Sequence, residues 1–251
     1  MASHGGPNII EDNLYICFDA ANTISYPGIG TGTTWYDMST GFVGIMSNMT
    51  ASDYTSGAPD YFTFDNSVSD DAAGHKQSID ITSLTPSITI PPITWVSWLR
   101  RKQSCFSTTP IGTTDQLESP GTDWKRYMME IGNIDKLQYY WSTQSSSFNW
   151  NPNITIPEDE WVMCAASVSS SSATLYMFEL DGTISQGTNT TTHVSATYPI
   201  TDGPFSIGKL PYEINNTYFG GDIAIVQIYT KALSQAELTQ NFNATKNRFL
   251  L

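Results

Sequence analysis

The sequence predicts an all-β protein built as a sandwich of two antiparallel sheets, with a short helix near the C-terminus. Short segments that alternate apolar and polar residues recur along the chain, separated by Gly, Pro, Asn, Asp and Ser, which is typical of antiparallel strands. Charged residues make up only 14% of the 251 residues, while Ser, Thr, Asn and Gly abound. That composition favours a turn-rich β surface, and sandwiches of this length commonly form one domain.

Each expected strand is an apolar run bounded by turn-forming residues. The expected strands are Leu14–Asp19, Tyr61–Asp65, Ser78–Ile81, Ile93–Arg100, Tyr127–Gly132, Lys136–Ser142, Trp161–Val168, Ala173–Leu180, Phe205–Gly208 and Gly221–Tyr229. The short polar connections at residues 132–135 and 169–172 predict two hairpins. The last strand is apolar on both faces, which indicates a central position with cover on each side.

One helix is predicted immediately after this last strand. Ser234 and Glu237 have the spacing of a capping box, in which each side chain binds the other residue's backbone N–H. Leu238, Phe242 and Thr245 then fall on one helical face. We therefore expect the helix to pack on the sandwich and to cover the last strand.

Charge and cysteine content exclude several classes of function. The formal net charge is −13, which repels nucleic acid and anionic membranes unless a local basic patch exists. The run Arg100–Lys102 is the nearest candidate, and we interpret it as a solvated strand end. Cys17, Cys105 and Cys164 form no CxxC pair, so we expect reduced thiols and no zinc site. The start of the chain shows no signal-peptide pattern, which predicts folding in a reducing cytoplasm.

Several motifs resemble one known group of domains. They are Leu14–Asn22, Thr33–Ser39, Ile93–Trp98, Phe219–Ala224 and Asn241–Lys246. In this order they are similar to the concanavalin A-like, laminin-G-like jelly rolls of phage virion proteins. The resemblance implies a single jelly-roll domain over residues 14–251, preceded by an N-terminal arm over residues 1–13. It also implies a structural protein of the virion, as capsid decoration or as a tail or fibre component. Its partners would be other virion proteins and copies of itself.

The sequence shows no catalytic arrangement, so we expect no enzyme activity. Glycosidases that share the fold carry a Glu-x-Asp-x-x-Glu strand motif, and this chain lacks it. The contiguous acids Glu158–Glu160 precede a strand and are interpreted as solvated loop residues. A glycoside hydrolase, which needs two facing carboxyl groups, is therefore the least favoured of three functions. The second is a lectin-like module that binds host surface glycan.

Two candidate sites remain, one for metal and one for glycan. Asp65, Asp70 and Asp71 lie in one loop, and carboxylate oxygens are the ligands that calcium prefers. Because their spacing matches no defined calcium motif, surface acids are the alternative and no cofactor is expected. Tyr140 and Trp150 are the candidate glycan-stacking residues, since each lies among polar neighbours in an aromatic-rich region. A packing role is the alternative for both.

Overall fold

The computed structural model describes residues 8–28, 32–65, 77–81, 88–102, 108–114, 126–132, 135–143, 146–198, 205–209 and 218–250. Within these residues, no helix is long and apolar enough to cross a membrane.

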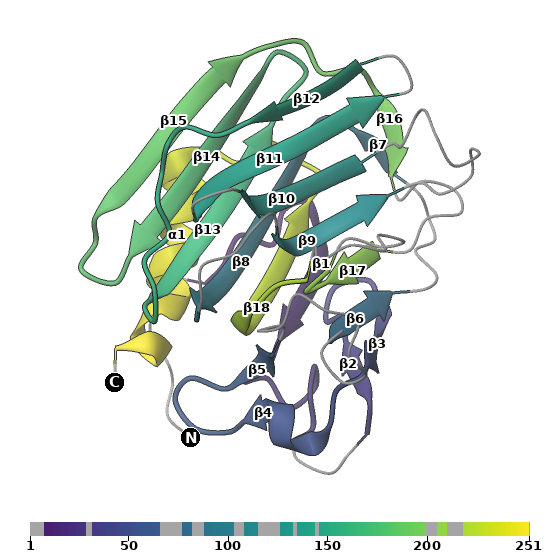
Figure 1. The fold of residues 1–251 in the computed structure, drawn as a ribbon, viewed down its shortest axis with the longest axis vertical. Coiled ribbons are helices and arrows are strands. Elements are labelled where there is room, and N and C mark those ends of the chain that lie inside the picture. The colour runs from purple at the N-terminus through teal and green to yellow at the C-terminus, as the bar shows by residue number, and fades with distance from the viewer. Residues whose placement is uncertain are drawn as a thin grey trace.

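Two antiparallel sheets face each other and form a sandwich (Figure 1). The first sheet has the strand order β15-β14-β13-β8-β18-β5-β4, and β1 also pairs with β18. The second sheet has the order β12-β11-β10-β9-β17-β6-β3-β2, and a separate pair joins β16 to β7. The predicted all-β sandwich, with one helix after Leu233, is confirmed.

The strands of the first sheet are β1 (Leu14–Asp19), β4 (Tyr54–Thr55), β5 (Tyr61–Phe64), β8 (Ile93–Arg101), β13 (Trp161–Val168), β14 (Ser172–Glu179), β15 (Ile184–Thr190) and β18 (Gly221–Tyr229). Those of the second are β2 (Thr34–Tyr36), β3 (Val43–Ser47), β6 (Ser78–Ile81), β9 (Thr108–Thr114), β10 (Arg126–Gly132), β11 (Lys136–Thr143), β12 (Ser146–Trp150) and β17 (Phe205–Ile207). The remaining elements are β7 (Ile88–Ile90), β16 (Ala196–Tyr198), the 3-10 helices η1 (Ala51–Asp53) and η2 (Lys246–Phe249), and the helix α1 (Gln235–Thr245).

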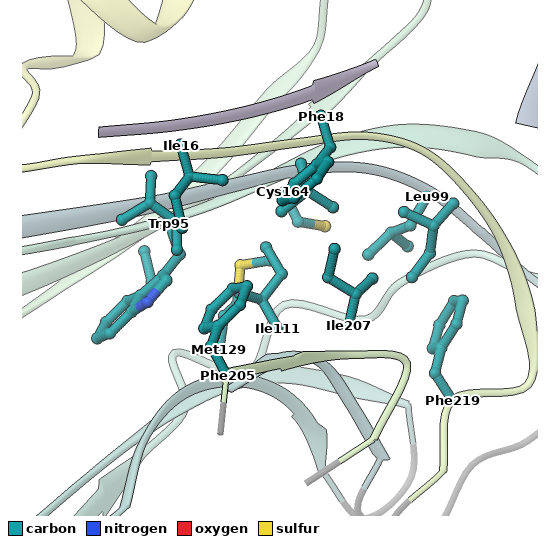
Figure 2. Packing of buried hydrophobic residues seen from close by; sticks show 14 of the residues in the cluster. Ile16, Phe18, Trp95, Leu99, Ile111, Met129, Cys164, Phe205, Ile207 and Phe219 are labelled. Carbon is teal, nitrogen blue, oxygen red and sulfur yellow. The ribbon is translucent and has the colours of Figure 1, made fainter. Parts of the chain in front are cut away.

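The main core lies between the two sheets (Figure 2). Phe18 and Trp95 reach into it from the first sheet, and Met129 and Ile207 from the second. All four side chains are buried. Alternation explains this arrangement, because every second residue of a strand points to the same face.

A second core covers the outer face of the first sheet. The capping box forms as predicted, since Ser234 Oγ accepts from Glu237 N while the Glu237 side chain accepts from Ser234 N. Leu238 and Phe242 are buried against the sheet. The Trp98 ring stacks on the Phe242 ring at 5.5 Å, and its Nε1 donates to Thr245. The cover expected over β18 is therefore provided by α1.

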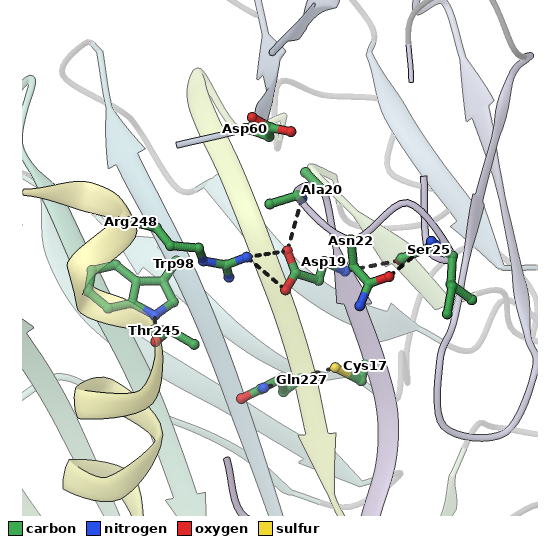
Figure 3. A network of polar contacts seen from close by, with 12 residues as sticks. Cys17, Asp19, Ala20, Asn22, Ser25, Asp60, Trp98, Gln227, Thr245 and Arg248 are labelled. Carbon is green, nitrogen blue, oxygen red and sulfur yellow. Dashed lines mark hydrogen bonds and ion pairs between the residues drawn. The ribbon is translucent and has the colours of Figure 1, made fainter. Parts of the chain in front are cut away.

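The 3-10 helix η2 extends this cover and is joined to β1 by an ion pair. Arg248 Nη1 lies 2.9 Å from both carboxylate oxygens of Asp19 (Figure 3). Phe249, in η2, belongs to this second core, and its ring stacks on that of Trp98 at 4.1 Å.

Residues 8–13, the described part of the predicted N-terminal arm, lie against the helix of the same chain. Asn241 Oδ1 accepts from Ile10 N at 2.7 Å, and Gln240 Nε2 donates to the carbonyl of Asn8 at 2.8 Å. The backbone of Asn13 accepts from Thr230 N, which joins the segment to the end of β18. This part of the chain is thus ordered by its own fold.

The interpretation of Arg100–Lys102 as a solvated strand end is wrong. Arg101 is 4% exposed, and it donates to the carbonyl of Ile156 and pairs with Glu158. Arg100 and Lys102 both pair with one buried carboxylate. These positive charges lie where β8 ends and where acids from distant parts of the chain come together, which the local sequence does not reveal.

Candidate ligand-binding pocket

The structure does not bring the two predicted glycan-stacking residues together. Trp150 pairs across the strands with Tyr139, whereas Tyr140 pairs with Asn149. Because directly paired residues share a face of the sheet, Trp150 and Tyr140 point to opposite faces. Trp150 packs against the main core, with its ring 6.4 Å from that of Tyr139. Tyr140 points outward, and the guanidinium of Arg126 lies 5.9 Å from its ring.

The predicted calcium loop is described only in part. Asp65 is exposed directly after β5, and its backbone N–H donates to the side chain of Gln77. Asp70 and Asp71 lie outside the described residues. In the part of the chain that the structure describes, no three or more His, Cys, Asp or Glu side chains gather in a group that could hold a metal ion.

Two of the three cysteines are described, and both are free and buried. Burial raises the pKa of the Cys17 thiol to about 12, with the nearby carboxylate of Asp19 as a further cause. Burial also raises the pKa of Cys164. Both thiols are therefore protonated at neutral pH and unsuited to nucleophilic or metal chemistry. Cys105 lies outside the described residues.

A cavity of about 340 Å³ opens at one end of the first sheet, and we call it the rim pocket. It lies where β4, β5 and the C-terminal end of the chain meet, at the lower end of the molecule in Figure 1. Its volume is in the range that binds small ligands. The residues that line it are Thr55, Ser56, Gly57, Ala58, Pro59, Tyr61, Arg100, Trp161 and Phe249.

The loop between β4 and β5 forms one wall, and Asp60 holds that loop in place. One oxygen of Asp60 accepts from Gly57 N at 2.6 Å, and the other accepts from the Tyr54 hydroxyl at 2.9 Å. Burial raises the pKa of Tyr54, and its hydrogen bond to Asp60 raises it further, so the phenol remains a donor. The loop is therefore preorganised by an acid that does not itself line the pocket.

Arg100 and two aromatic rings form the opposite wall. The Arg100 guanidinium lies 5.2 Å from the ring centres of both Tyr61 and Trp161. The two rings contact each other edge to face at 5.4 Å, and Phe249 packs on Trp161 at 5.0 Å. Arg100 is thus fixed between flat apolar surfaces, as expected for a guanidinium in cation–π contact.

The buried carboxylate of Asp222 holds Arg100 in position. Asp222 is fully buried, and its Oδ2 accepts from Arg100 Nε at 2.7 Å and Nη2 at 2.6 Å. Its Oδ1 accepts from Thr63 Oγ1 at 2.8 Å and lies 2.8 Å from Lys102 Nζ. A carboxylate with this number of donors is well stabilised away from water.

Strand register explains why these residues meet. Arg100 on β8 lies directly opposite Trp161 on β13 and Asp222 on β18, and Asp222 lies opposite Thr63 on β5. The four residues thus form one row across four strands, on the face that α1 covers further along. Sequence reasoning missed this site because the row joins residues from distant parts of the chain. The one local signal is an arginine that ends an otherwise apolar run.

This pocket combines aromatic surface with polar hydrogen-bonding groups. Sugars bind such sites by placing a C–H face on a ring and by hydrogen bonding through their hydroxyls. The guanidinium can donate to hydroxyls, and so can the side chains of Thr55 and Ser56. Among the described residues that line the pocket there is no carboxylate, histidine or cysteine.

Solved structures of other proteins share this fold. One is domain 4 of AbnA, a GH43 extracellular arabinanase from Geobacillus stearothermophilus, which was solved in complex with arabinotriose. Its TM-score to this chain is 0.61 at 15% sequence identity, and the match covers 92% of this chain and 99% of that domain. Trypanosoma rangeli sialidase, as its covalent intermediate with 2,3-difluorosialic acid, has a TM-score of 0.60 and 9% identity, covering 100% of this chain. This chain spans 36% of that sialidase.

The match in sequence is to a family and not to an individual protein. No curated protein sequence matches the chain. The laminin-G-type family described as the concanavalin A-like lectin/glucanases superfamily matches residues 73–239, which is more than half of the chain. The family match and the shared fold agree with the two antiparallel sheets described above. The chain therefore belongs to the concanavalin A-like lectin/glucanases superfamily.

Proposed function

We propose that this protein is a non-catalytic carbohydrate-binding module and that a sugar ring binds in the rim pocket. The observation that carries the proposal is the wall formed by Tyr61, Trp161 and Arg100, in which two rings and a guanidinium are held rigidly beside a cavity. Rigid aromatic surface with fixed donors binds sugars at little cost in conformational entropy.

The lining of the pocket supports binding without catalysis. Glycoside hydrolysis needs two carboxyl groups on either side of the scissile bond. Two acids beside the pocket have other partners: Asp222 binds Arg100, and Asp60 holds the β4–β5 loop. Neither is among the residues that line the cavity. A hydrolase with this site would lack its acid and its base.

The first test measures binding of oligosaccharides to the wild type and to Tyr61→Ala. The arabinanase domain that shares this fold was solved with arabinotriose, so arabinotriose is one probe and a broad glycan array is the other. We expect saturable binding by calorimetry, weakened about tenfold in Tyr61→Ala because the stacking surface is lost.

Tyr140→Ala is the matched control for this experiment. Tyr140 is also a partly exposed tyrosine beside an arginine, but it lies on the outer face of the second sheet. It should bind like the wild type, and thermal melting should show that both variants are folded. Equal weakening in the two variants, or no glycan bound by the wild type, would contradict the proposal.

A role in a phage virion is a second proposal, and it is compatible with glycan binding. It is supported by the resemblance of motifs such as Phe219–Ala224 and Asn241–Lys246 to virion jelly rolls. The protein would then be made in the host cytoplasm and assemble with other virion proteins and copies of itself. Mass spectrometry of purified particles should detect it at a fixed copy number. Particles of normal composition without it would refute this role.

A further inference from the structure

The ionic groups beside the rim pocket are unequal in number and in exposure. Arg100 and Lys102 share a single carboxylate, that of Asp222, so the three groups carry one net positive charge. The side chains of Arg100 and Lys102 are 25% and 36% exposed, whereas that of Asp222 is fully buried. The two cations are therefore partly exposed to solvent, whereas their shared anion is buried.

The acids on the neighbouring segments do not line the cavity. Asp60 keeps its charge, since its hydrogen-bond donors are neutral, but it is directed to Gly57 N and the Tyr54 hydroxyl, and Glu158 pairs with Arg101. Glu160, which precedes Trp161, is exposed to solvent, where its charge is screened by salt. Among the described residues that line the cavity, Arg100 is the only charged one. A chain with a net charge of −13 thus has a cationic group at its candidate binding site.

We propose that the sugar bound in the rim pocket is acidic and carries a carboxylate or sulfate group that faces Arg100. This inference rests on the proposed function, since it names the ligand class of the same site. Tyr61 and Trp161 would contact the sugar ring, while the anionic group would lie against the side of the guanidinium that faces the cavity. Charge-assisted hydrogen bonds to an anion are stronger than those to a hydroxyl, so the acidic group decides which glycan binds best.

The test compares glycans that differ only in the charged group. An array holding neutral, carboxylated and sulfated glycans gives the overall preference. Lactose, 3′-sialyllactose and 3′-sulfolactose form one matched series within it, and other neutral and acidic pairs extend the comparison. We expect the acidic member of a bound pair to bind about tenfold more tightly than its neutral counterpart at low salt. The advantage should shrink as salt concentration rises.

Lys102→Gln is the informative variant, because Lys102 contributes the excess charge without lining the pocket. It should reduce the advantage of the acidic glycan and leave binding of the neutral one unchanged. Lys209→Gln is the control, since Lys209 also pairs with one aspartate, Asp80, but lies at the second sheet. It should behave like the wild type.

The possible outcomes separate this inference from the proposed function. Hits confined to neutral glycans, or equal affinity within the matched pairs, would overturn the acidic ligand and leave carbohydrate binding in place. No hits of any kind with folded protein would overturn both. A preference for carboxylated over sulfated members, or the reverse, identifies which anionic group the pocket selects, and either result supports the inference.

Discussion

At the scale of single residues, His193 connects the two sheets at one end of the sandwich. It is 4% exposed, and its Nδ1 lies 2.8 Å from the carbonyl of Ser169, in the turn between β13 and β14. A carbonyl can only accept, so Nδ1 carries the proton, and Nε2 accepts from the Tyr139 hydroxyl on β11 at 2.8 Å. The neutral ring therefore fits this site.

Stability should depend on pH through this histidine. Burial lowers the pKa of His193 below the ordinary value near 6.5, so below about pH 6.5 the unfolded chain binds a proton that the folded chain does not. The stabilisation is fully present above pH 6.5 and is lost progressively as pH falls from there through the lower pKa of the folded state. The melting temperature of the wild type should drop between pH 7.5 and 5. His193→Gln should melt lower at pH 7.5 but lose less over the same range. Parallel pH profiles would show that His193 does not titrate differently on folding.

At the scale of elements, α1 is held by charge at its N-terminus. Glu237 accepts from the backbone of Ser234 within the capping box, and its other oxygen accepts from Lys231 Nζ at 2.6 Å. The hydrogen bond from Lys231, followed by that from the Ser234 backbone, lowers the pKa of Glu237 to about 2. An acid at a helix N-terminus also interacts favourably with the helix dipole.

Glu237→Gln tests this arrangement, because glutamine keeps the capping hydrogen bonds and removes only the charge. The charged form stabilises the fold above pH 4.5, and this contribution is lost as pH falls towards 2. We expect the variant to be less stable at pH 7 by about 0.5 kcal/mol, a small value because the ion pair is partly solvated. Urea unfolding should show this difference at pH 7 and none near pH 2. Glu11→Gln, at an exposed acid, should match the wild type at both.

At the scale of the whole molecule, both ends of the chain complete the outer cover of the first sheet. Residues 8–13 bind α1 through Asn241 and Gln240, and Ile10 packs against the second core. At the far end, η2 is tied to β1 by Arg248 and Asp19. The helical cover is thus joined to the sandwich by segments near both ends of the chain, and residues 8–13 contribute to it.

Deletion of residues 1–12 should therefore weaken the helical cover while the sandwich stays folded. Loss of the buried part of Ile10 and of the backbone hydrogen bonds should lower the free energy of unfolding by about 1–2 kcal/mol. Hydrogen exchange should quicken in α1 and stay slow in β8, β13 and β18. Unchanged exchange in α1 would mean that the segment is not part of the fold in solution.

The elements that could be predicted are those whose own sequence shows an apolar–polar alternation or a helix-capping pattern. The ten predicted strands correspond to strands of the structure, as does the helix that begins after Ser234. The strands missed include β9, which contains Pro110 and Gly112, and β15, a polar edge strand with no buried residue. A strand paired along one edge can lack a hydrophobic face, because its partner supplies the hydrogen bonds. Whether such a segment forms a strand then depends on the neighbouring strand and not on its own residues.

The candidate site shows the same division between local and distant information. The sequence by itself determined the all-β class, the superfamily motifs and the capped helix, because each depends on residues close together in the chain. Only the tertiary structure decided that Tyr140 and Trp150 point apart and that Arg100 meets Trp161 and Asp222. Strand register sets those contacts. Register is fixed by packing over the whole sheet, so no local pattern in the sequence could have located the rim pocket.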